Sequence, residues 1–258
     1  FIAKADYEVD MKAATLKEIV NALKSIPSVS IIMEMDDIFG NENGIYSNSI
    51  FSGKNWERPC SMEIINPNNK NSIQVNAGIR ITGGASREPY FTPKHGFRIL
   101  FKSKYGPSKL NYKLFNDSEI TRFNTLVLRA GYNDTRSISF CRNCMHSRNI
   151  TYVNDQWAKI SYKAMGQIST HGRYVNLFVN GLYWGLYNIQ ERPDAAFNAD
   201  YIGGKRGDWD VIKHTNDFSD GENTPHVIDG SLDSWNELYT LSSSPNLDYI
   251  SILEILNP

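Results

Sequence analysis

The sequence predicts an α+β fold, with antiparallel β-strands dominating its first part and helices and loops its last. Three observations predict it: an amphipathic helix near the start, strand signals through the middle, and a strong hairpin signal near residue 180. Strands and helices do not alternate regularly, which argues against a parallel βαβ fold. A chain of 258 residues that is 41% hydrophobic can bury a sizeable core.

The first predicted element is a helix that ends before Pro27. Thr15 and Glu18 have the spacing of a capping box, in which each side chain bonds the backbone N–H of the other residue. A buried strand is expected at 28–34, and a loop at 36–48, which is rich in Asp, Asn and Gly. The apolar residues of the helix recur with the spacing of one helical face: Leu16, Ile19, Val20 and Leu23.

Strand signals dominate the next part of the chain. A run of turn-forming residues at 66–69 separates the first two strands. A glycine-rich segment at 83–87 separates the third strand from the fourth. The predicted strands are 61–65, 72–75, 77–82, 96–101 and 125–128.

A second helix is expected to start near Ser137, because it would place two i, i+4 apolar pairs on one face. These pairs are Phe140 with Cys144 and Cys141 with Met145. The Cys-x-x-Cys spacing lacks the second pair that tetrahedral zinc would need, so we expect both cysteines to be buried, reduced and free of metal.

The clearest hairpin has strands at 174–179 and 182–189 around Asn180-Gly181, which favours a type I′ turn. We expect these two strands to share one antiparallel sheet with 77–82 and 96–101. After Arg192 the sequence predicts a polar loop and further helices. The loop is 203–223, and the helices are 194–201, 234–241 and 247–256.

The composition excludes several classes of protein. Lys and Arg number 27 against 28 Asp and Glu, so a general attraction to nucleic acid or anionic lipid is not expected. No apolar run is long enough for a transmembrane segment, and three cysteines are too few for a disulfide scaffold. The chain starts at Phe1, which predicts a mature form or an excised piece, and its 14 Tyr favour a secreted or cell-surface protein.

Several blocks of the sequence, covering 28–214, resemble the CotH family of spore coat protein H kinases. Residues 78–87 (GIRITGGASR) resemble its G-x-R-x-x-G-x-A/S-S signature, and 94–101 (KHGFRILF) its K-x-x-F-R-I strand. Residues 126–129 (LVLR), followed by Asn133-Asp134, are similar to another block. The most distinctive is 179–187 (VNGLYWGLY), which is followed by Glu191-Arg192, and 53–59 (GKNWERP) also resembles longer members.

The resemblance implies an atypical protein-kinase-like fold of a bacterial protein. The antiparallel β-rich lobe that holds nucleotide would occupy 28–192, after an N-terminal helix in 1–27, and a truncated start of a helical lobe would occupy 193–258. Members transfer phosphate from ATP, with Mg²⁺ or Mn²⁺, to Ser of partner proteins. The expected partners are therefore a nucleotide and a protein substrate.

The acidic residues that hold the metal in the family are missing from the expected places. Members carry a C-terminal W-D-x-D-like strand, whereas Trp209-Asp210 and Trp235-Asn236 come too early and lack the second Asp. We assign no catalytic or metal-binding residue, and we expect the chain by itself to be inactive. The full-length protein would be an enzyme if it supplies the missing Asp residues. The alternative is a secreted or cell-surface binding module that keeps the CotH fold without catalysis.

Nine residues are candidates for nucleotide binding. Strand alternation places Arg98 on the face opposite Phe97 and Ile99, where a kinase carries a phosphate-binding cation. We expect Arg80, Lys94 and Arg98 to converge with the glycine backbone on one cleft, and Glu191 to lie at its rim. The full set is Arg80, Gly83, Gly84, Ser86, Lys94, Arg98, Arg142, Glu191 and Arg192.

Each candidate also has a structural interpretation. The glycines fit an ordinary hairpin loop, Arg98 a solvated strand arginine and Arg142 a surface helix residue. Glu191 and Arg192 fit an ion pair at a strand end. The acidic residues in 36–42 have no EF-hand spacing, so an acidic solvated loop is expected there instead of a calcium site.

Overall fold

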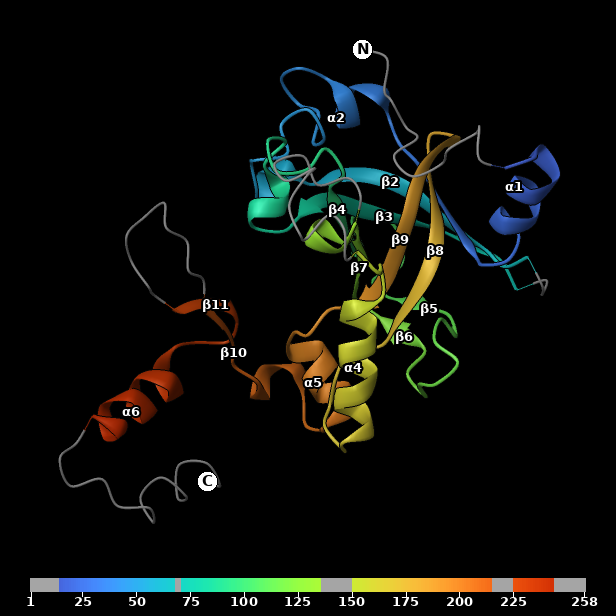
Figure 1. The fold of residues 1–258 in the computed structure, drawn as a ribbon. Coiled ribbons are helices and arrows are strands. Elements are labelled where there is room, and N and C mark those ends of the chain that lie inside the picture. The colour runs from blue at the N-terminus through green and yellow to red at the C-terminus, as the bar shows by residue number, and fades with distance from the viewer. Residues whose placement is uncertain (1–13, 68–70, 136–149, 215–224, 244–258) are drawn as a thin grey trace. The chain divides into compact units, whose positions relative to one another are not determined.

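The structure is a computed structural model that describes residues 14–67, 71–135, 150–214 and 225–243 (Figure 1). The chain divides into two compact units between Arg192 and Pro193. The first unit contains the large β-sheet, and the second contains a small hairpin and two helices. No helix in these ranges is long and apolar enough to cross a membrane.

The first unit is built on a closed β-barrel. Adjacent strands run antiparallel except β1 and β8, whose parallel pairing closes the barrel. The expectation that 77–82, 96–101, 174–179 and 182–189 share a sheet is confirmed, but the sheet is not antiparallel throughout. In order of adjacency the strands are β1 (Ser28–Ile32), β2 (Arg58–Ile65), β3 (Ile73–Thr82), β4 (Gly96–Leu100), β7 (Thr125–Arg129), β9 (Leu182–Glu191) and β8 (Gly172–Val179).

Alternate residues of each strand fill the barrel, as Ile79, Ile99 and Leu128 do with no exposed surface. Their neighbours along each strand therefore point outward. Four outward-facing residues lie side by side on adjacent strands, because Arg80 pairs with Arg98, Arg98 with Val127, and Val127 with Gln190. We call this set the outer row: Arg80, Arg98, Val127 and Gln190.

The predicted hairpin joins β8 to β9. Asn180 and Gly181 both have positive φ, 48° and 81°, as a type I′ turn requires. The Asn180 amide also donates to the carbonyl of Met33 and accepts from the Met33 N–H, each at 2.9 Å. The turn therefore fixes the hairpin to the end of β1, next to the strand pair that closes the barrel.

Several short elements surround the barrel. Helix α1 (Leu16–Leu23) has the predicted capping box between Thr15 and Glu18. The segment predicted as a loop at 36–48 begins with α2 (Met35–Phe39), because Ile38 and Phe39 bury their side chains in the core. The remaining short elements are η1 (Lys54–Trp56), η2 (Ala85–Arg87), β5 (Leu110–Asn111), β6 (Arg122–Phe123) and η3 (Tyr132–Asp134).

Two other expectations need correction. The strands predicted at 72–75 and 77–82 are one strand, since Asn76 pairs with Ser61 and continues the ladder. Helix α4 (Asn154–Ala164) was not predicted, because the side that contacts the barrel is polar and Trp157 is 69% exposed. The helices predicted near 137 and at 247–256 lie outside the described residues, as do Cys141 and Cys144.

The second unit begins with α5 (Ala195–Tyr201), where a helix was predicted. Its N-cap Asp194 accepts hydrogen bonds from the N–H groups of Ala196 and Phe197, both at 3.1 Å. The segment predicted as a loop at 203–223 contains η4 (Arg206–Asp208) and β10 (Val211–His214). β10 pairs with β11 (Pro225–Asp229). The helix predicted at 234–241 is α6 (Asp233–Ser242), the last helix in the described residues.

A glycine on β3 permits close packing of the turn that follows β4. A Cβ atom at Gly78 would lie only 2.4 Å from Cε2 of the Tyr105 ring. We expect Gly78→Ala to lower the free energy of unfolding by roughly 1–3 kcal/mol, the usual cost of overpacking. Chemical denaturation of the purified protein measures this change.

The control is the same substitution in a Tyr105→Ala background, where the ring that causes the overlap is absent. There Gly78→Ala should cost clearly less, as a double-mutant cycle would show. Equal costs in both backgrounds would contradict the role assigned to the Tyr105 ring.

Candidate functional site

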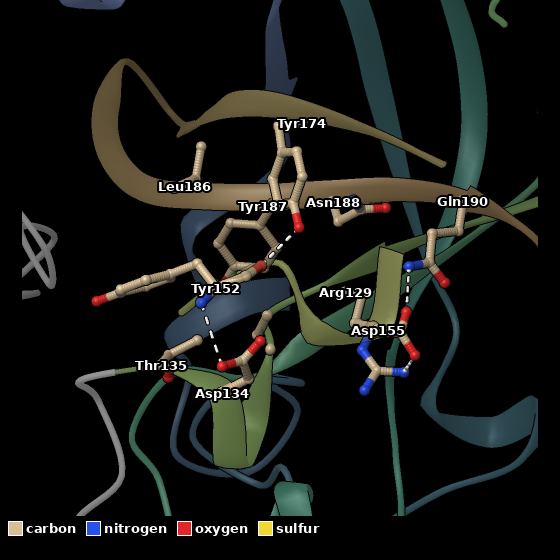
Figure 2. Close-up of a pocket in the computed structure, with 12 residues that line it drawn as sticks. Arg129, Asp134, Thr135, Tyr152, Asp155, Tyr174, Leu186, Tyr187, Asn188 and Gln190 are labelled. Atoms are coloured by element: carbon tan, nitrogen blue, oxygen red, sulfur yellow. Dashed lines mark hydrogen bonds and ion pairs between the residues drawn. The ribbon is translucent and has the colours of Figure 1, made fainter. Parts of the chain in front are cut away.

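The outer face of β7 and β9 borders a pocket that is open to solvent (Figure 2). Its lining is mostly polar and aromatic, and it comes from β7, η3, the start of α4, β8 and β9. Gln190 belongs both to this lining and to the outer row. The principal lining side chains are Arg129, Asp134, Tyr152, Asp155, Tyr174, Asn188 and Gln190.

Asp134 anchors the segment that leads into α4. Its carboxylate accepts hydrogen bonds from the N–H groups of Thr151, Tyr152 and Asn154 at 3.0–3.1 Å, and from the Asn154 amide. The Tyr174 hydroxyl donates to the carbonyl of Tyr152 at 2.5 Å. These bonds hold the first turn of α4 over the sheet, and with it the side chain of Asp155.

Asp155 forms ion pairs with two cationic side chains at the side of the pocket. It lies 3.0 Å from Arg129 Nη1 and from Lys159 Nζ, and it accepts a 2.9 Å hydrogen bond from the Gln190 amide. Burial tends to raise the pKa of Asp155, but the Gln190 bond and the two cations outweigh it and hold the pKa below its usual value. Asp155 is therefore ionised at neutral pH.

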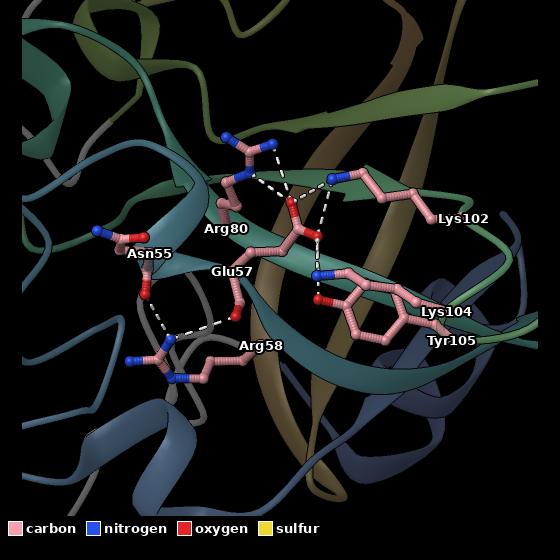
Figure 3. A network of polar contacts seen from close by, with 7 residues as sticks. All are labelled: Asn55, Glu57, Arg58, Arg80, Lys102, Lys104 and Tyr105. Carbon is pink, nitrogen blue, oxygen red and sulfur yellow. Dashed lines mark hydrogen bonds and ion pairs between the residues drawn. The ribbon is translucent and has the colours of Figure 1, made fainter.

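A second charged cluster surrounds Glu57, whose side chain is almost fully buried (Figure 3). Arg80 Nε and Nη2 lie 2.9 Å from its carboxylate, Lys102 Nζ 2.8 Å and Lys104 Nζ 3.0 Å. The Tyr105 hydroxyl donates to it at 2.9 Å. We call Glu57, Arg80, Lys102, Lys104 and Tyr105 the Glu57 cluster.

These contacts keep Glu57 ionised. Burial alone would raise its pKa, but the bonds from Lys102, Lys104 and Tyr105 and the charge of Arg80 lower it from 4.5 to about 2. One negative charge thus stands among three positive charges.

The structure brings together some of the residues predicted to bind nucleotide and separates others. Arg80 and Arg98 lie next to each other on the outer face. Lys94 is instead buried, with its ammonium group donating to the carbonyl of Leu186 at 2.7 Å and 4.8 Å from the centre of the Tyr187 ring. The expected convergence of Arg80, Lys94 and Arg98 is not found.

Glu191 does not lie at the rim of a cleft beside Arg98. Along β9 it points to the side opposite Gln190, where it is buried, accepts from the N–H of His171 at 2.8 Å and lies 2.9 Å from His171 Nδ1. Arg192 follows at the boundary between the two units. Arg142 lies outside the described residues.

The glycine loop after β3 folds onto its own residues. Gly83 has φ 130°, and a Cβ there would lie 2.0 Å from the Ser86 hydroxyl oxygen. The Gly84 carbonyl accepts from the N–H of Arg87 at 2.9 Å, and the Ser86 carbonyl lies 2.9 Å from His95 Nδ1. Whether this loop contacts a phosphate stays a prediction.

The sequence analysis did not find Glu57 as the shared partner of Arg80, Lys102 and Lys104. The available signal was local: Lys102, Lys104 and Tyr105 follow directly after the predicted strand 96–101. It also missed Arg129 and Asp155, since Asp155 belongs to a helix that was not predicted. Trp209-Asp210 has a structural role, because the Trp209 indole donates to the Gly203 carbonyl and Asp210 accepts from the N–H of Ser231.

Comparison with known protein families identifies the family of the chain. The family model described as CotH kinase protein matches residues 79–256, most of the chain. The resemblance found in the sequence is thereby confirmed. No curated protein matches the chain.

Replacing Glu57 with Gln should remove a pH-dependent part of the stability. Because the folded-state pKa is below the usual value, the stabilisation is present above pH 4.5 and is lost as pH falls toward about 2. We expect Glu57→Gln to lower the free energy of unfolding at pH 7 by roughly 1.5–3 kcal/mol, the scale of hydrogen bonds to a charged group.

Denaturation curves from pH 7 to pH 2 test this expectation, with Glu63→Gln on β2, the strand that begins directly after Glu57, as the control. The difference between wild type and Glu57→Gln should shrink as the pH falls. A difference that stays constant over this range would show that the charge of Glu57 is not responsible.

Proposed function

The chain belongs to the CotH kinase family, and we propose that it is an incomplete catalytic domain of an atypical protein kinase that transfers phosphate from ATP to Ser of partner proteins. In this proposal the barrel unit holds the nucleotide, and the second unit belongs to a helical lobe. The family match supports a kinase-like function, and the arrangement of the outer face supports a place for the nucleotide.

The observation that carries the proposal is the position of Arg98. It lies on the outer row next to Arg80 on one side, and one residue, Val127, separates it from Gln190 of the pocket on the other. Phosphoryl transfer depends on positioning the phosphates among cations that neutralise developing charge. Arg98, with Arg129 and Lys159 beside the pocket, supplies such cations from β4, β7 and α4.

We infer that the base and ribose occupy the pocket and that the phosphates extend toward Arg98. Tyr152 and Tyr174 line the pocket and offer aromatic surface that suits a base. The positive charges needed locally do not come from a basic chain, since its formal net charge is −1.

The divalent metal has no evident place in the described residues. These ranges contain no group of three or more His, Cys, Asp or Glu side chains that could hold a metal ion. We therefore assign neither Mg²⁺ nor Mn²⁺ to particular residues and derive no step through the metal.

The second candidate function is a secreted or cell-surface binding module without catalysis. One observation favours it: both carboxylates of the pocket are already engaged, Asp134 by the N–H groups before α4 and Asp155 by Arg129, Lys159 and Gln190. Production of ADP from ATP by the full-length protein with a Ser-containing peptide library, in Mg²⁺ or Mn²⁺, separates the two, because the chain by itself is expected to be inactive in either case. Peptide-dependent ADP release supports the kinase, and its absence supports the module.

Replacing Arg98 with Ala tests the nucleotide site directly. We expect ATP binding to weaken by roughly 1.5–3 kcal/mol, because the phosphates lose a charged hydrogen-bond donor. Isothermal titration of ATP into each protein measures the loss. Arg122→Ala is the matched control, since Arg122 is an exposed strand arginine on β6, and it should bind ATP like wild type. Equal affinities for Arg98→Ala and wild type would leave only the fold to support the proposal.

A further inference from the structure

The Glu57 cluster has more positive charge than its carboxylate can neutralise. Arg80, Lys102 and Lys104 carry three positive charges and Glu57 one negative charge, which leaves a local excess of two. The two carboxylate oxygens already receive contacts from two Arg80 nitrogens, both lysines and Tyr105. A carboxylate has about four acceptor positions, so Glu57 has no capacity for further donors.

The cations keep donors that face outward. A lysine ammonium has three N–H groups, and Lys104 uses one in its 3.0 Å contact with Glu57 and a second toward the Tyr105 side chain, which leaves one for a ligand. The exposed fraction of the side chain increases from 15% at Arg80 to 36% at Lys102 and 58% at Lys104. The excess charge is therefore carried mainly at the exposed end of the cluster, where a ligand can reach it.

The cluster is also held in place before any ligand binds. The turn that carries both lysines packs closely on β3. A Cβ atom at Gly78 of β3 would lie 2.4 Å from the Tyr105 ring, and one at Gly106 of the turn would lie 2.9 Å from the Asn76 carbonyl oxygen. Buried Glu57 then holds the ends of both lysines and of Arg80 within hydrogen-bond distance of one carboxylate (Figure 3). Such preorganisation lowers the entropic cost of binding.

We propose that the Glu57 cluster is a binding site for a phosphate dianion, with Lys102, Lys104 and Arg80 as its donors. A phosphate monoester carries close to two negative charges at neutral pH and three acceptor oxygens, which matches the excess charge and the spare donors. The phosphate can come from free phosphate, from the nucleotide or from a phosphorylated residue of a protein partner. This site goes beyond the proposed kinase function and does not rest on it.

The first experiment uses inorganic phosphate as the probe. The midpoint of thermal unfolding of wild type should be higher in phosphate than in chloride of equal ionic strength, because phosphate binds the folded state. Lys102→Gln/Lys104→Gln should lose this difference. Lys17→Gln/Lys24→Gln, which removes the same charge from exposed positions around α1, should keep it.

The single variants Lys104→Gln and Lys104→Glu guard against a folding defect, because Lys104 is the most exposed member and Arg80, Lys102 and Tyr105 remain on Glu57. Phosphate affinity should fall by roughly tenfold or more in Lys104→Gln, and further in Lys104→Glu. A phosphate effect that is absent from wild type, or unchanged in Lys102→Gln/Lys104→Gln, would overturn the proposal.

Two further probes identify the source of the phosphate once the phosphate effect is found. A labelled peptide with one phosphoserine, compared with its unphosphorylated form, tests a protein partner, and ATP tests the nucleotide. Loss of binding of either probe in Lys104→Gln supports the site and names its source. If Lys104→Gln loses binding of neither the phosphopeptide nor ATP, free phosphate is the ligand. An ATP affinity that depends on Arg98 but not on Lys104 would show that the nucleotide site and the Glu57 cluster are separate sites. A phosphate effect in a protein that does not bind ATP would contradict the proposed kinase function and leave the phosphate site standing.

Discussion

The parallel pairing of β1 with β8 is the constraint on which the rest of the first unit depends. It closes the sheet into a barrel, so that none of the seven strands keeps a free edge. Closure also fixes the register, and with it the face to which each side chain points. The Asn180 amide reinforces this corner by bonding the backbone of Met33 on both its N–H and its carbonyl.

Because most residues inside the barrel are apolar, Arg80 of β3, Arg98 of β4 and Arg129 of β7 lie outside it, beside the amide side chains of β9. Where a helix packs on a sheet, the contact is usually apolar, but these residues are not covered by an apolar layer. Helix α4 contacts the sheet through Asp155, Gln156 and Lys159, which bond Arg129, Asn188 and Gln190. Buried polar groups in such a layer need hydrogen-bond partners, so their positions depend on the direction of the hydrogen bonds as well as on the shapes of the side chains.

Two carboxylates outside the barrel, Glu57 and Asp155, hold the cations around them. Glu57 gathers three, and Asp155 gathers two. Asp134 adds a further negative charge to the pocket beside Asp155, so the two cations and two carboxylates there balance. The outer face is therefore electrically balanced at the pocket and positive toward Arg98 and the Glu57 cluster, a distribution that suits a ligand with a neutral end and a phosphorylated end.

Local sequence determined the features that depend on near neighbours in the chain. The capping box of α1, the type I′ turn at Asn180-Gly181 and the outward direction of Arg98 follow from spacing and alternation, and the ordered blocks identified the family. Tertiary packing decided the partners of each charge. Lys94 bonds the carbonyl of Leu186, Glu191 pairs with His171, and Glu57 meets Lys102 across 45 residues of sequence. No local pattern encodes such contacts, because the free energy of burying a charge depends on which distant group can satisfy it, and only the closed barrel brings those groups together.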